Sequence, residues 1–323
     1  MPTQQDYSQV RGFNYFLKPE KGGLAWLDLN SDRTELELRR AKEYFPKMNT
    51  IRVQLSWSIY NQDPMRFEEN FEKVLLIANR LGLKVVATLF SRCPAMGNIW
   101  IDHFMEGWNW ITVRTEGGRK EIFRPYLKSI VGKHRNDERI LIWDICNEPF
   151  PYTEGSYGMS RVPEWMREVE RGEYEWLKEM YEICKNELHP QAPLGISVLQ
   201  DYGREGLERV ENISDVLLIH PYYIHDQDNE EEKAKFLKLL DEYVACSKEV
   251  KKPLLATETC WPSQDDKWSV ENIRFSLSEL KKRNIGWIAA KLHQDKSHAH
   301  MPATEFIKAD GSLRPGHEVF NLF

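Results

Sequence analysis

Short runs of apolar and β-branched residues alternate along the chain with longer segments in which apolar residues recur at helical spacing. The short runs have the length of strands, and they are continuous rather than alternating, which is typical of strands covered on both faces. The pattern predicts eight strands, at residues 10–16, 50–56, 84–90, 140–146, 194–200, 215–220, 253–258 and 286–292.

Amphipathic segments lie between most of these strands, and residues 66–82 are the clearest, because Gly82 follows the apolar repeat as a helix C-cap. Helices are predicted at 32–45, 66–82, 119–134, 163–188, 230–250 and 269–284. Strand–helix alternation in a chain of 323 residues without a Pro/Ser-rich linker predicts one domain over 1–323, a single (β/α)8 TIM barrel of the α/β class. A doubly wound sheet is the main alternative, but no glycine-rich phosphate-binding sequence follows the first strand.

Polar residues follow the predicted strands in an unusual concentration. One polar strand end is usually only a cap, but the carboxyl ends of barrel strands together form the face that carries active sites. The polar strand-end residues are Asn14, Arg52, Ser91, Arg92, Asn147, Glu148, Gln200, Asp201, His220, Tyr222, Glu258 and His293.

The composition narrows the classes of partner. A net charge of −6 gives no basic footprint for nucleic acid, and no apolar stretch approaches 18 residues, so neither nucleic acid nor membrane is expected as a partner. Five widely spaced cysteines without a C-x-x-C pair favour reduced thiols over disulfides. With no signal peptide visible, the expected location is the cytoplasm, although removal of a leader would leave the same sequence.

Two strand-ending glutamates, Glu148 and Glu258, are candidates for paired chemistry across the barrel mouth. Two carboxyls about 5–5.5 Å apart suit a retaining glycosidase, and a gap of about 6.5–9.5 Å suits an inverting one. The sequence leaves that separation open.

These glutamates belong to a set of motifs that resembles the clan A glycoside hydrolases, in particular the cellulase-like enzymes of family 5. The resemblance spans nearly the whole chain and rests on NTIRVQLSW (49–57), Asn-Glu-Pro (147–149), HPYY (220–223) and ATETCW (256–261), each at a strand end and in this order. It implies a retaining β-glycosidase that acts on a carbohydrate by double displacement and needs no cofactor or metal.

The resemblance also implies roles for individual residues. Glu148 would be the general acid/base and Glu258 the nucleophile. Arg52 would hold Glu258 ionised, and Tyr222 would donate a hydrogen bond to Glu258. Alternatively, Arg52 could form an ordinary buried ion pair, and Tyr222 could be an ordinary core tyrosine. His220 would orient Tyr222 or the acid/base.

Other positions are expected to bind or support the substrate. Asn147 resembles the asparagine that binds the sugar 2-hydroxyl, and Pro149 would restrain the backbone that aims Glu148. Asn14 would either support the site or only connect the first strands. Trp57, Trp261, His293 and Trp108 complete the set of candidates.

Two segments after strands are distinctive. Residues 91–118 form a long aromatic-rich loop after the third strand, which includes Trp108 and could be either a sugar-stacking platform or a self-packed lid. At the eighth strand the family usually has a tryptophan, where this chain has Lys291 and His293. This departure suggests a polar innermost subsite and a charged or differently configured sugar. Histidines 293, 298 and 300 are weak evidence for a metal.

The main functional hypothesis is therefore a retaining β-glycosidase of oligosaccharides or small glycosides. An endo-β-1,4-glycanase of the cellulase, mannanase or xylanase type acting on polysaccharide is the enzymatic alternative, and transglycosylation is a further one. A non-catalytic carbohydrate-binding barrel is the alternative from another class. Residues 307–323 are expected to close the barrel with a turn and a final helix.

Overall fold

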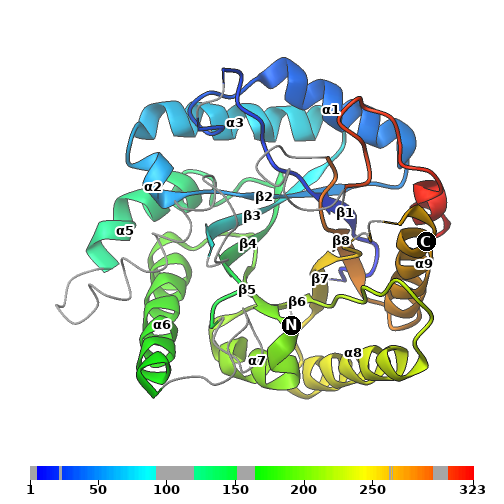
Figure 1. Cartoon of the computed structure of the whole chain (residues 1–323). Helices are drawn as coiled ribbons and strands as arrows, with labels where there is room; N and C mark the ends of the chain where they lie inside the picture. Colours follow the sequence, from blue (N-terminus) through cyan, green and yellow to red (C-terminus); the bar gives the residue numbers. More distant parts are fainter. Residues whose placement is uncertain are drawn as a thin grey trace.

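The computed structural model describes residues 6–21, 24–91, 120–150, 164–261, 263, 265–293 and 305–323. Within this part of the chain, eight parallel strands close into a barrel in chain order, and β8 pairs back to β1 (Figure 1). The strands are β1 (Arg11–Asn14), β2 (Thr50–Gln54), β3 (Lys84–Ser91), β4 (Ile140–Asn147), β5 (Leu194–Leu199), β6 (Val216–His220), β7 (Leu254–Thr259) and β8 (Gly286–Ala289). The predicted (β/α)8 barrel is confirmed.

Helices surround the barrel on its outside, as Figure 1 shows along the barrel axis. The α-helices are α1 (Ser31–Tyr44), α2 (Trp57–Tyr60), α3 (Pro64–Arg80), α5 (Lys120–Leu127), α6 (Glu164–Glu182), α7 (Gly203–Val210), α8 (Glu230–Val250) and α9 (Asp266–Lys282). The π-helical segments are η1 (Lys128–Gly132) and η3 (Ile183–Leu188). The 3-10 helices are η4 (Gln200–Tyr202), η5 (Glu211–Ile213) and η7 (His317–Leu322).

Local sequence signals define helix ends, and α3 is a good example. The Asp63 side chain accepts a hydrogen bond from the backbone N–H of Arg66, and Pro64 occupies the first helical position, where a missing N–H costs nothing. At the other end Gly82 has φ +68°, a conformation that glycine adopts without strain. The helix therefore begins two residues before the predicted 66–82 and stops just short of its end.

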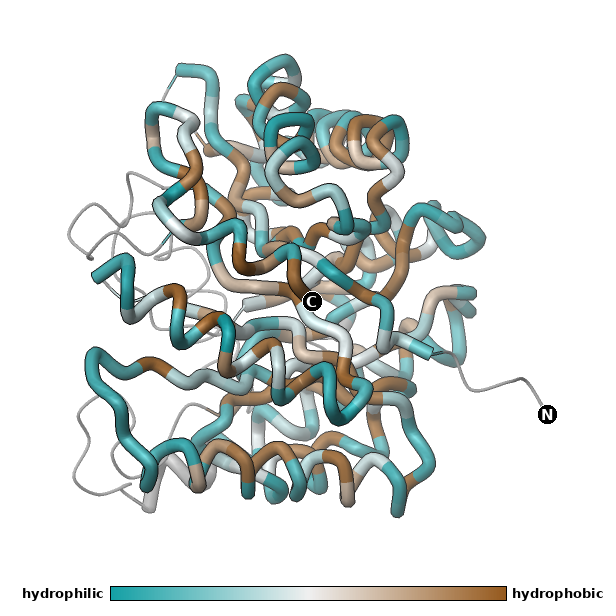
Figure 2. The backbone as a smooth tube through the Cα atoms, turned by 90° about the vertical axis from the view of Figure 1, so that its right-hand side faces the viewer, coloured by the Kyte–Doolittle hydropathy of each residue, from teal (hydrophilic) through white to brown (hydrophobic). Residues whose placement is uncertain are grey.

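The strands are buried on both faces, which explains their continuous apolar runs. Large side chains fill the layer between barrel and helices, and Trp143 on β4 and Trp176 on α6 both lie in this core, as expected. In Figure 2 the helices alternate between brown and teal along their turns, as helices with one buried face do.

Several elements differ from the expectations, and α7, β8 and the final helix show why. The short helix α7 was not predicted, because its eight residues include two glycines and only two large apolar residues, Leu207 and Val210. The predicted eighth strand, 286–292, stops at Ala289, because Lys291 has a left-handed backbone with φ +55° that ends regular pairing. The final helix is present, as the tight turn η7.

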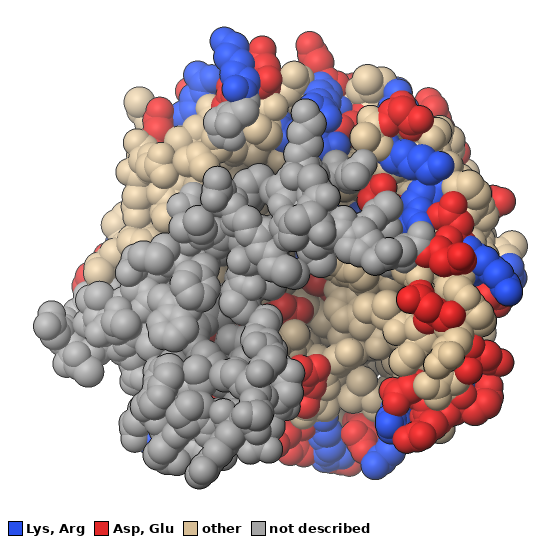
Figure 3. Space-filling model, in the orientation of Figure 1, with Lys and Arg blue, Asp and Glu red and all other residues tan. Residues whose placement is uncertain are grey.

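The outer surface carries charges of both signs. On the face drawn in Figure 3, Lys and Arg are interspersed with Asp and Glu around the coloured rim. Among the described residues, no helix combines the length and the apolar character that crossing a bilayer would require.

Candidate active site

A bulge in β4 brings two polar side chains to the same side of the strand. Between Asp144 and Asn147, β4 advances by three residues while its partner β5 advances by two, from Gly195 to Ser197. Residues three apart point to opposite faces of a regular strand, but one extra residue cancels this alternation. Asp144 and Asn147 therefore both reach Arg52 inside the barrel.

Arg52 of β2 is the centre of the buried polar network. Its Nη2 donates to Oδ2 of Asp144 at 2.7 Å and to Oδ1 of Asn147 at 2.6 Å, and its Nη1 donates to Oδ1 of Asn14 at 2.8 Å. The same Nη1 donates to Oε1 of Glu258 at 2.5 Å. Burial lowers the pKa of Arg52, but the charges of Asp144 and Glu258 outweigh this and raise it above its ordinary value. The permanently charged guanidinium of Arg52 thus links β2 to β1, β4 and β7.

Glu258 is held as an anion by the groups around it. Besides Arg52, the hydroxyl of Tyr222 donates to its Oε2 at 2.6 Å. Burial raises the pKa of Glu258, yet electrostatic interactions with His220 and Arg52 and the hydrogen bond from Tyr222 together lower it below the ordinary value. Burial and the charge of Glu258 in turn raise the pKa of Tyr222, which keeps its proton available for donation.

Glu148 has different partners, although it lies beside Glu258. Its Oε1 shares a hydrogen bond of 2.7 Å with Nδ1 of His220, whose Nε2 lies 3.1 Å from Oγ1 of Thr257. Thr257 and Glu258 are adjacent in β7, and both reach the site because β7 contains an extra residue between Ala256 and Thr259 relative to β8.

The backbone at Glu148 is unusual. Its φ is +50°, rather than the extended conformation that normally precedes a proline. Two hydrogen bonds hold this turn, because Glu148 N donates to the Ser197 carbonyl at 2.9 Å and Phe150 N donates to Oε2 of Glu173 at 3.0 Å. Contacts to β5 and α6 therefore set the direction of Glu148, in addition to the restraint expected from Pro149.

The two glutamates and His220 form one compact group. One carboxylate oxygen of Glu148, one of Glu258 and a ring nitrogen of His220 all lie within 4.8 Å of one another. Three such groups can hold a cation, but here each carboxylate already accepts hydrogen bonds, from His220 or from Arg52 and Tyr222. This donor set suits one charged and one proton-exchanging carboxyl better than a metal.

The aromatic candidates lie in three different places. The Trp261 ring packs edge-on against Tyr222, with ring centroids 6.1 Å apart, and borders the group. Trp57 packs on Phe123 at 4.8 Å, against the helical layer. Trp108 and the rest of the aromatic-rich loop lie outside the described residues, so their sugar-stacking role stays a prediction.

The end of β8 places its two polar candidates on different sides. Lys291 is buried, with its Nζ 5.7 Å from the centre of the Trp261 ring. His293 instead packs against Tyr15 at 6.2 Å, and burial lowers its pKa to about 4 despite the nearby Glu37. Its predicted contact with substrate would have to be made from this position, behind β1.

Three residues of the network were not singled out from the sequence. Asp144, Ser197 and Thr257 are fully buried, and their side chains bind Arg52 or His220. An aspartate inside the apolar run ILIWDIC was a visible signal, because a buried carboxylate needs a partner. The serine and the threonine gave no comparable signal.

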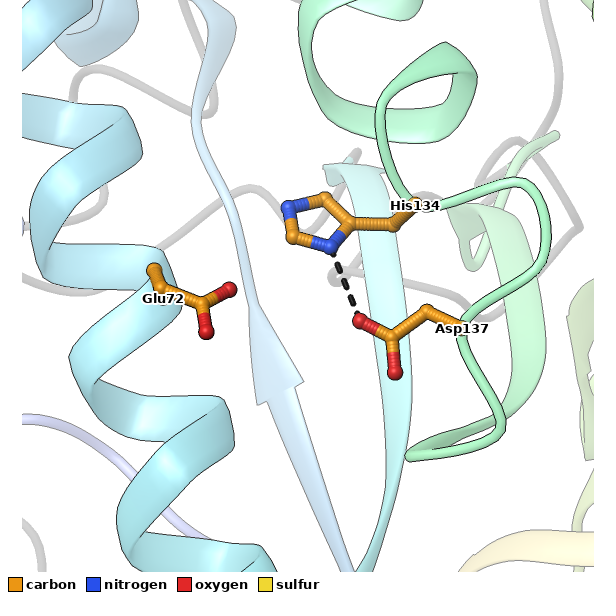
Figure 4. A group of neighbouring side chains, drawn as sticks. All are labelled: Glu72, His134 and Asp137. Carbon is orange, nitrogen blue, oxygen red and sulfur yellow. Dashed lines mark hydrogen bonds and ion pairs between the residues drawn. The ribbon is translucent and has the colours of Figure 1, made fainter.

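A second group of metal-ligating side chains lies at the opposite end of the barrel. Glu72, His134 and Asp137 face one another before β4 begins, and Nδ1 of His134 lies 3.0 Å from Asp137 (Figure 4). Arg139 donates to both carboxylates, at 2.8 Å to Glu72 and 2.6 Å to Asp137. Arg139 thus offsets part of the negative charge of the two carboxylates, and the group fastens α3 to the segment before β4.

One protein family matches part of the chain by sequence. Residues 33–192, just under half of the chain, match the family described as cellulase (glycosyl hydrolase family 5). No curated protein matches the chain by sequence.

Solved structures share the fold over nearly the entire chain. A β-glucuronidase from Ruminococcus gnavus in complex with C6-substituted uronic isofagomine has a TM-score of 0.70 at 12% identity, covering 97% of this chain and 49% of that one. Its apo form has a TM-score of 0.69 at 12% identity, covering 99% and 52%. The chain spans about half the length of these enzymes. In motifs, fold and matched family, the chain resembles the cellulase-like glycoside hydrolases of family 5.

Proposed function

We propose that the protein is a retaining β-glycosidase with Glu258 as nucleophile and Glu148 as general acid/base. The observation that carries this proposal is the close approach of the two carboxylates, whose nearest oxygens lie within 4.8 Å. A gap of this size fits the about 5–5.5 Å of retaining enzymes and leaves little room for the water that an inverting enzyme places between its carboxyls.

The two carboxylates have surroundings that suit opposite tasks. Glu258 is bound by Arg52 and Tyr222, which favour the anion that a nucleophile requires. Glu148 shares its hydrogen bond with His220, a group that can give or accept a proton as the carboxyl changes state.

The reaction has two balanced steps. Glu258 forms an ester bond to the anomeric carbon while the glycosidic C–O bond breaks, and Glu148 gives its proton to the departing oxygen. Water then attacks the same carbon, Glu148 takes one proton from that water, and the bond to Glu258 breaks to release the sugar.

Asn147 would bind the sugar 2-hydroxyl during both steps. Its Oδ1 accepts from Arg52, which leaves the amide N–H groups for donation to the substrate. Hydrogen bonds at this hydroxyl strengthen in the transition state.

The substrates would be oligosaccharides or small glycosides in a reducing, cytoplasmic compartment. The described cysteines Cys146, Cys184, Cys246 and Cys260 are all buried and unbridged, which is compatible with that location. Several similar structures are β-glucuronidase complexes, but at 12% identity the likeness is one of fold and does not set the sugar.

Labelling with activated 2-fluoro glycosides, read by mass spectrometry, tests the proposal. We expect one sugar to remain attached to Glu258, and the Glu258→Ala variant not to be labelled. Glu148→Ala should lose about 10²–10⁴-fold in rate on substrates with poor leaving groups, since general acid catalysis contributes that much. It should lose far less on dinitrophenyl glycosides, which need no proton.

Glu175→Ala, at an exposed position on α6, is the matched control and should behave as wild type. Turnover that survives both catalytic substitutions would contradict the assignment. Binding of sugars without any turnover would favour the non-catalytic barrel, and cleavage of soluble polysaccharide in preference to small glycosides would favour an endo-glycanase.

A further inference from the structure

The end of β8 places a cation in the wall of the candidate site. Lys291 is 3% exposed, and its Nζ lies 5.7 Å from the centre of the Trp261 ring, within the range of a cation–π contact. Trp261 packs on Tyr222, and Tyr222 donates to Glu258. Three successive side-chain contacts, through Trp261 and Tyr222, therefore connect the ammonium group to the carboxylate of Glu258.

The backbone on both sides of Lys291 is tied to neighbouring strands. Ala290 N donates to the Thr259 carbonyl at 2.7 Å, and Leu292 N donates to the Asn14 carbonyl at 3.1 Å. Lys291 itself has φ +55°, a conformation that a side-chain-bearing residue keeps only where its surroundings impose it. The direction of this side chain is thus set by the barrel rather than by a loose loop.

The other buried cation of the site is fully engaged. Arg52 donates to Asp144, Glu258 and the two asparagines Asn14 and Asn147. A substrate anion that approached the group would be repelled by the negative charge of Glu258, and the N–H groups of Arg52 are already bound to its protein partners. An acidic sugar therefore needs a second positive charge, and the candidate for it is Lys291, which lies beside Trp261 at the end of β8.

We propose that Lys291 makes the enzyme selective for acidic sugars, by binding the carboxylate of a β-linked uronic acid in the innermost subsite. The proposal rests on the proposed glycosidase function and names its substrate class. A uronic acid differs from its neutral parent only at C6, where a carboxylate replaces a hydroxymethyl group. A charge-assisted hydrogen bond at this position would favour the acid by about 10- to 100-fold.

Matched pairs of aryl glycosides test this directly. The pairs are 4-nitrophenyl β-D-glucuronide with the β-D-glucoside, and the β-D-galacturonide with the β-D-galactoside. We expect wild-type kcat/KM to be at least about tenfold higher for the acid of the accepted pair. Lys291→Met should remove this preference, so that the acid-to-neutral ratio of kcat/KM falls to about one. Lys291→Arg should keep the preference, because the charge remains.

Lys267→Met is the matched control, because Lys267 also lies over a tryptophan ring, that of Trp268, at 5.0 Å, but on α9. This variant should leave the acid-to-neutral ratio unchanged. If Lys291→Met does not fold, as judged by circular dichroism, then the wild-type ratio and its retention in Lys291→Arg decide the question.

The outcomes separate the two proposals. Glu258-dependent cleavage of neutral glycosides in preference to their acids overturns the role of Lys291 and leaves the glycosidase assignment intact. An acid-to-neutral ratio unchanged by Lys291→Met also overturns it. Turnover of no glycoside, with no labelling of Glu258, refutes the glycosidase function, and the substrate class is then refuted with it.

Discussion

Arg52 and Asp144 form an ion pair of 2.7 Å in which both side chains are completely buried. They lie on β2 and β4, on either side of β3, and Asp144 also accepts from Thr88 of that strand and from Ser197 of β5. Glu258, the proposed nucleophile, lies on the opposite edge of the same guanidinium. Asp144 thus positions Arg52 without touching the carboxylates that react.

Substitution of Asp144 by asparagine should therefore damage both stability and catalysis. Breaking one side of a buried ion pair leaves an uncompensated charge and costs about 3–5 kcal/mol. We expect the free energy of unfolding, measured in urea, to fall by that amount, and kcat to fall because Arg52 is no longer held. Lys235→Gln, in an exposed ion pair on α8, should change neither. An Asp144→Asn protein as stable as wild type would contradict the proposed anchoring role.

The hydrogen bond from Tyr222 to Glu258 should be visible in the pH profile. Tyr222→Phe removes a donor that stabilises the carboxylate, so the pKa of Glu258 should rise. The acid limb of kcat/KM reports ionisation of the free enzyme, and we expect it to move to higher pH. At the optimum the rate should fall by about 10- to 100-fold, which is the value of a hydrogen bond to a charged group.

Tyr223→Phe serves as the control for Tyr222, because its ring stacks on Phe275 at 4.7 Å between α8 and α9. Its acid limb should coincide with that of wild type. An unshifted limb in Tyr222→Phe would mean that Tyr222 does not govern the ionisation of the nucleophile.

Glu173 should act on catalysis through the turn that carries the acid/base. It is fully buried on α6, and its Oε2 accepts from Phe150 N, two residues after Glu148. Both Glu148 and Phe150 have left-handed backbones, with φ +50° and +61°, so the turn depends on outside support. We expect Glu173→Gln to lower kcat on substrates with poor leaving groups by about tenfold, the value of a weakened charged hydrogen bond, with little change in KM.

A merely structural role for Glu173 would slow all substrates alike, including dinitrophenyl glycosides that need no acid. Such a uniform loss would contradict the positioning role. Glu175→Gln on the exposed side of the same helix should have no effect.

Acid should destabilise the protein partly through His293. Burial lowers its pKa to about 4, below the 6.5 of an exposed histidine. Between pH 4 and 6.5, His293 is protonated in the unfolded chain but neutral in the folded chain. The contribution of His293 to stability is therefore fully present above pH 6.5 and is lost as the pH falls towards 4. Urea titrations at pH 7 and 4.5 should show this loss as about 2–3 kcal/mol in wild type relative to His293→Gln.

The exposed His189 offers the control, and since its backbone is left-handed, asparagine is the suitable replacement. His189→Asn should leave the pH dependence of stability unchanged. Equal pH dependence in wild type and His293→Gln would show that His293 is not held neutral by burial.

The sequence predicts the barrel well because each strand buried on both faces appears as a continuous run of apolar residues. The runs 140–146 and 215–220 differ from β4 and β6 by one residue each, and α8 has the predicted bounds. The eighth run was drawn too long, because apolar residues continue after the left-handed turn at Lys291 ends the strand.

The network around the glutamates was only partly predictable. The motifs place Arg52 beside Glu258, as the structure does, but Asp144 depends on a bulge that a period of two residues does not reveal. His293 follows β8 by sequence, yet its ring packs behind β1 against Tyr15. Which distant residue a side chain contacts is decided by tertiary packing, and local sequence patterns carry little information about such contacts.

The pairing of β1 with β8 determines when the barrel can fold during synthesis. β1 needs β8 as its second neighbour, and Asn14 donates to the carbonyls of Thr257 and Ala289. A ribosome-bound chain lacks these partners until β8 has emerged, so this long-range pairing makes barrel closure slow. Arg52 and Glu258, 206 residues apart, meet only then. Nascent chains should therefore remain inert, and should depend on chaperones, until the eighth strand is released.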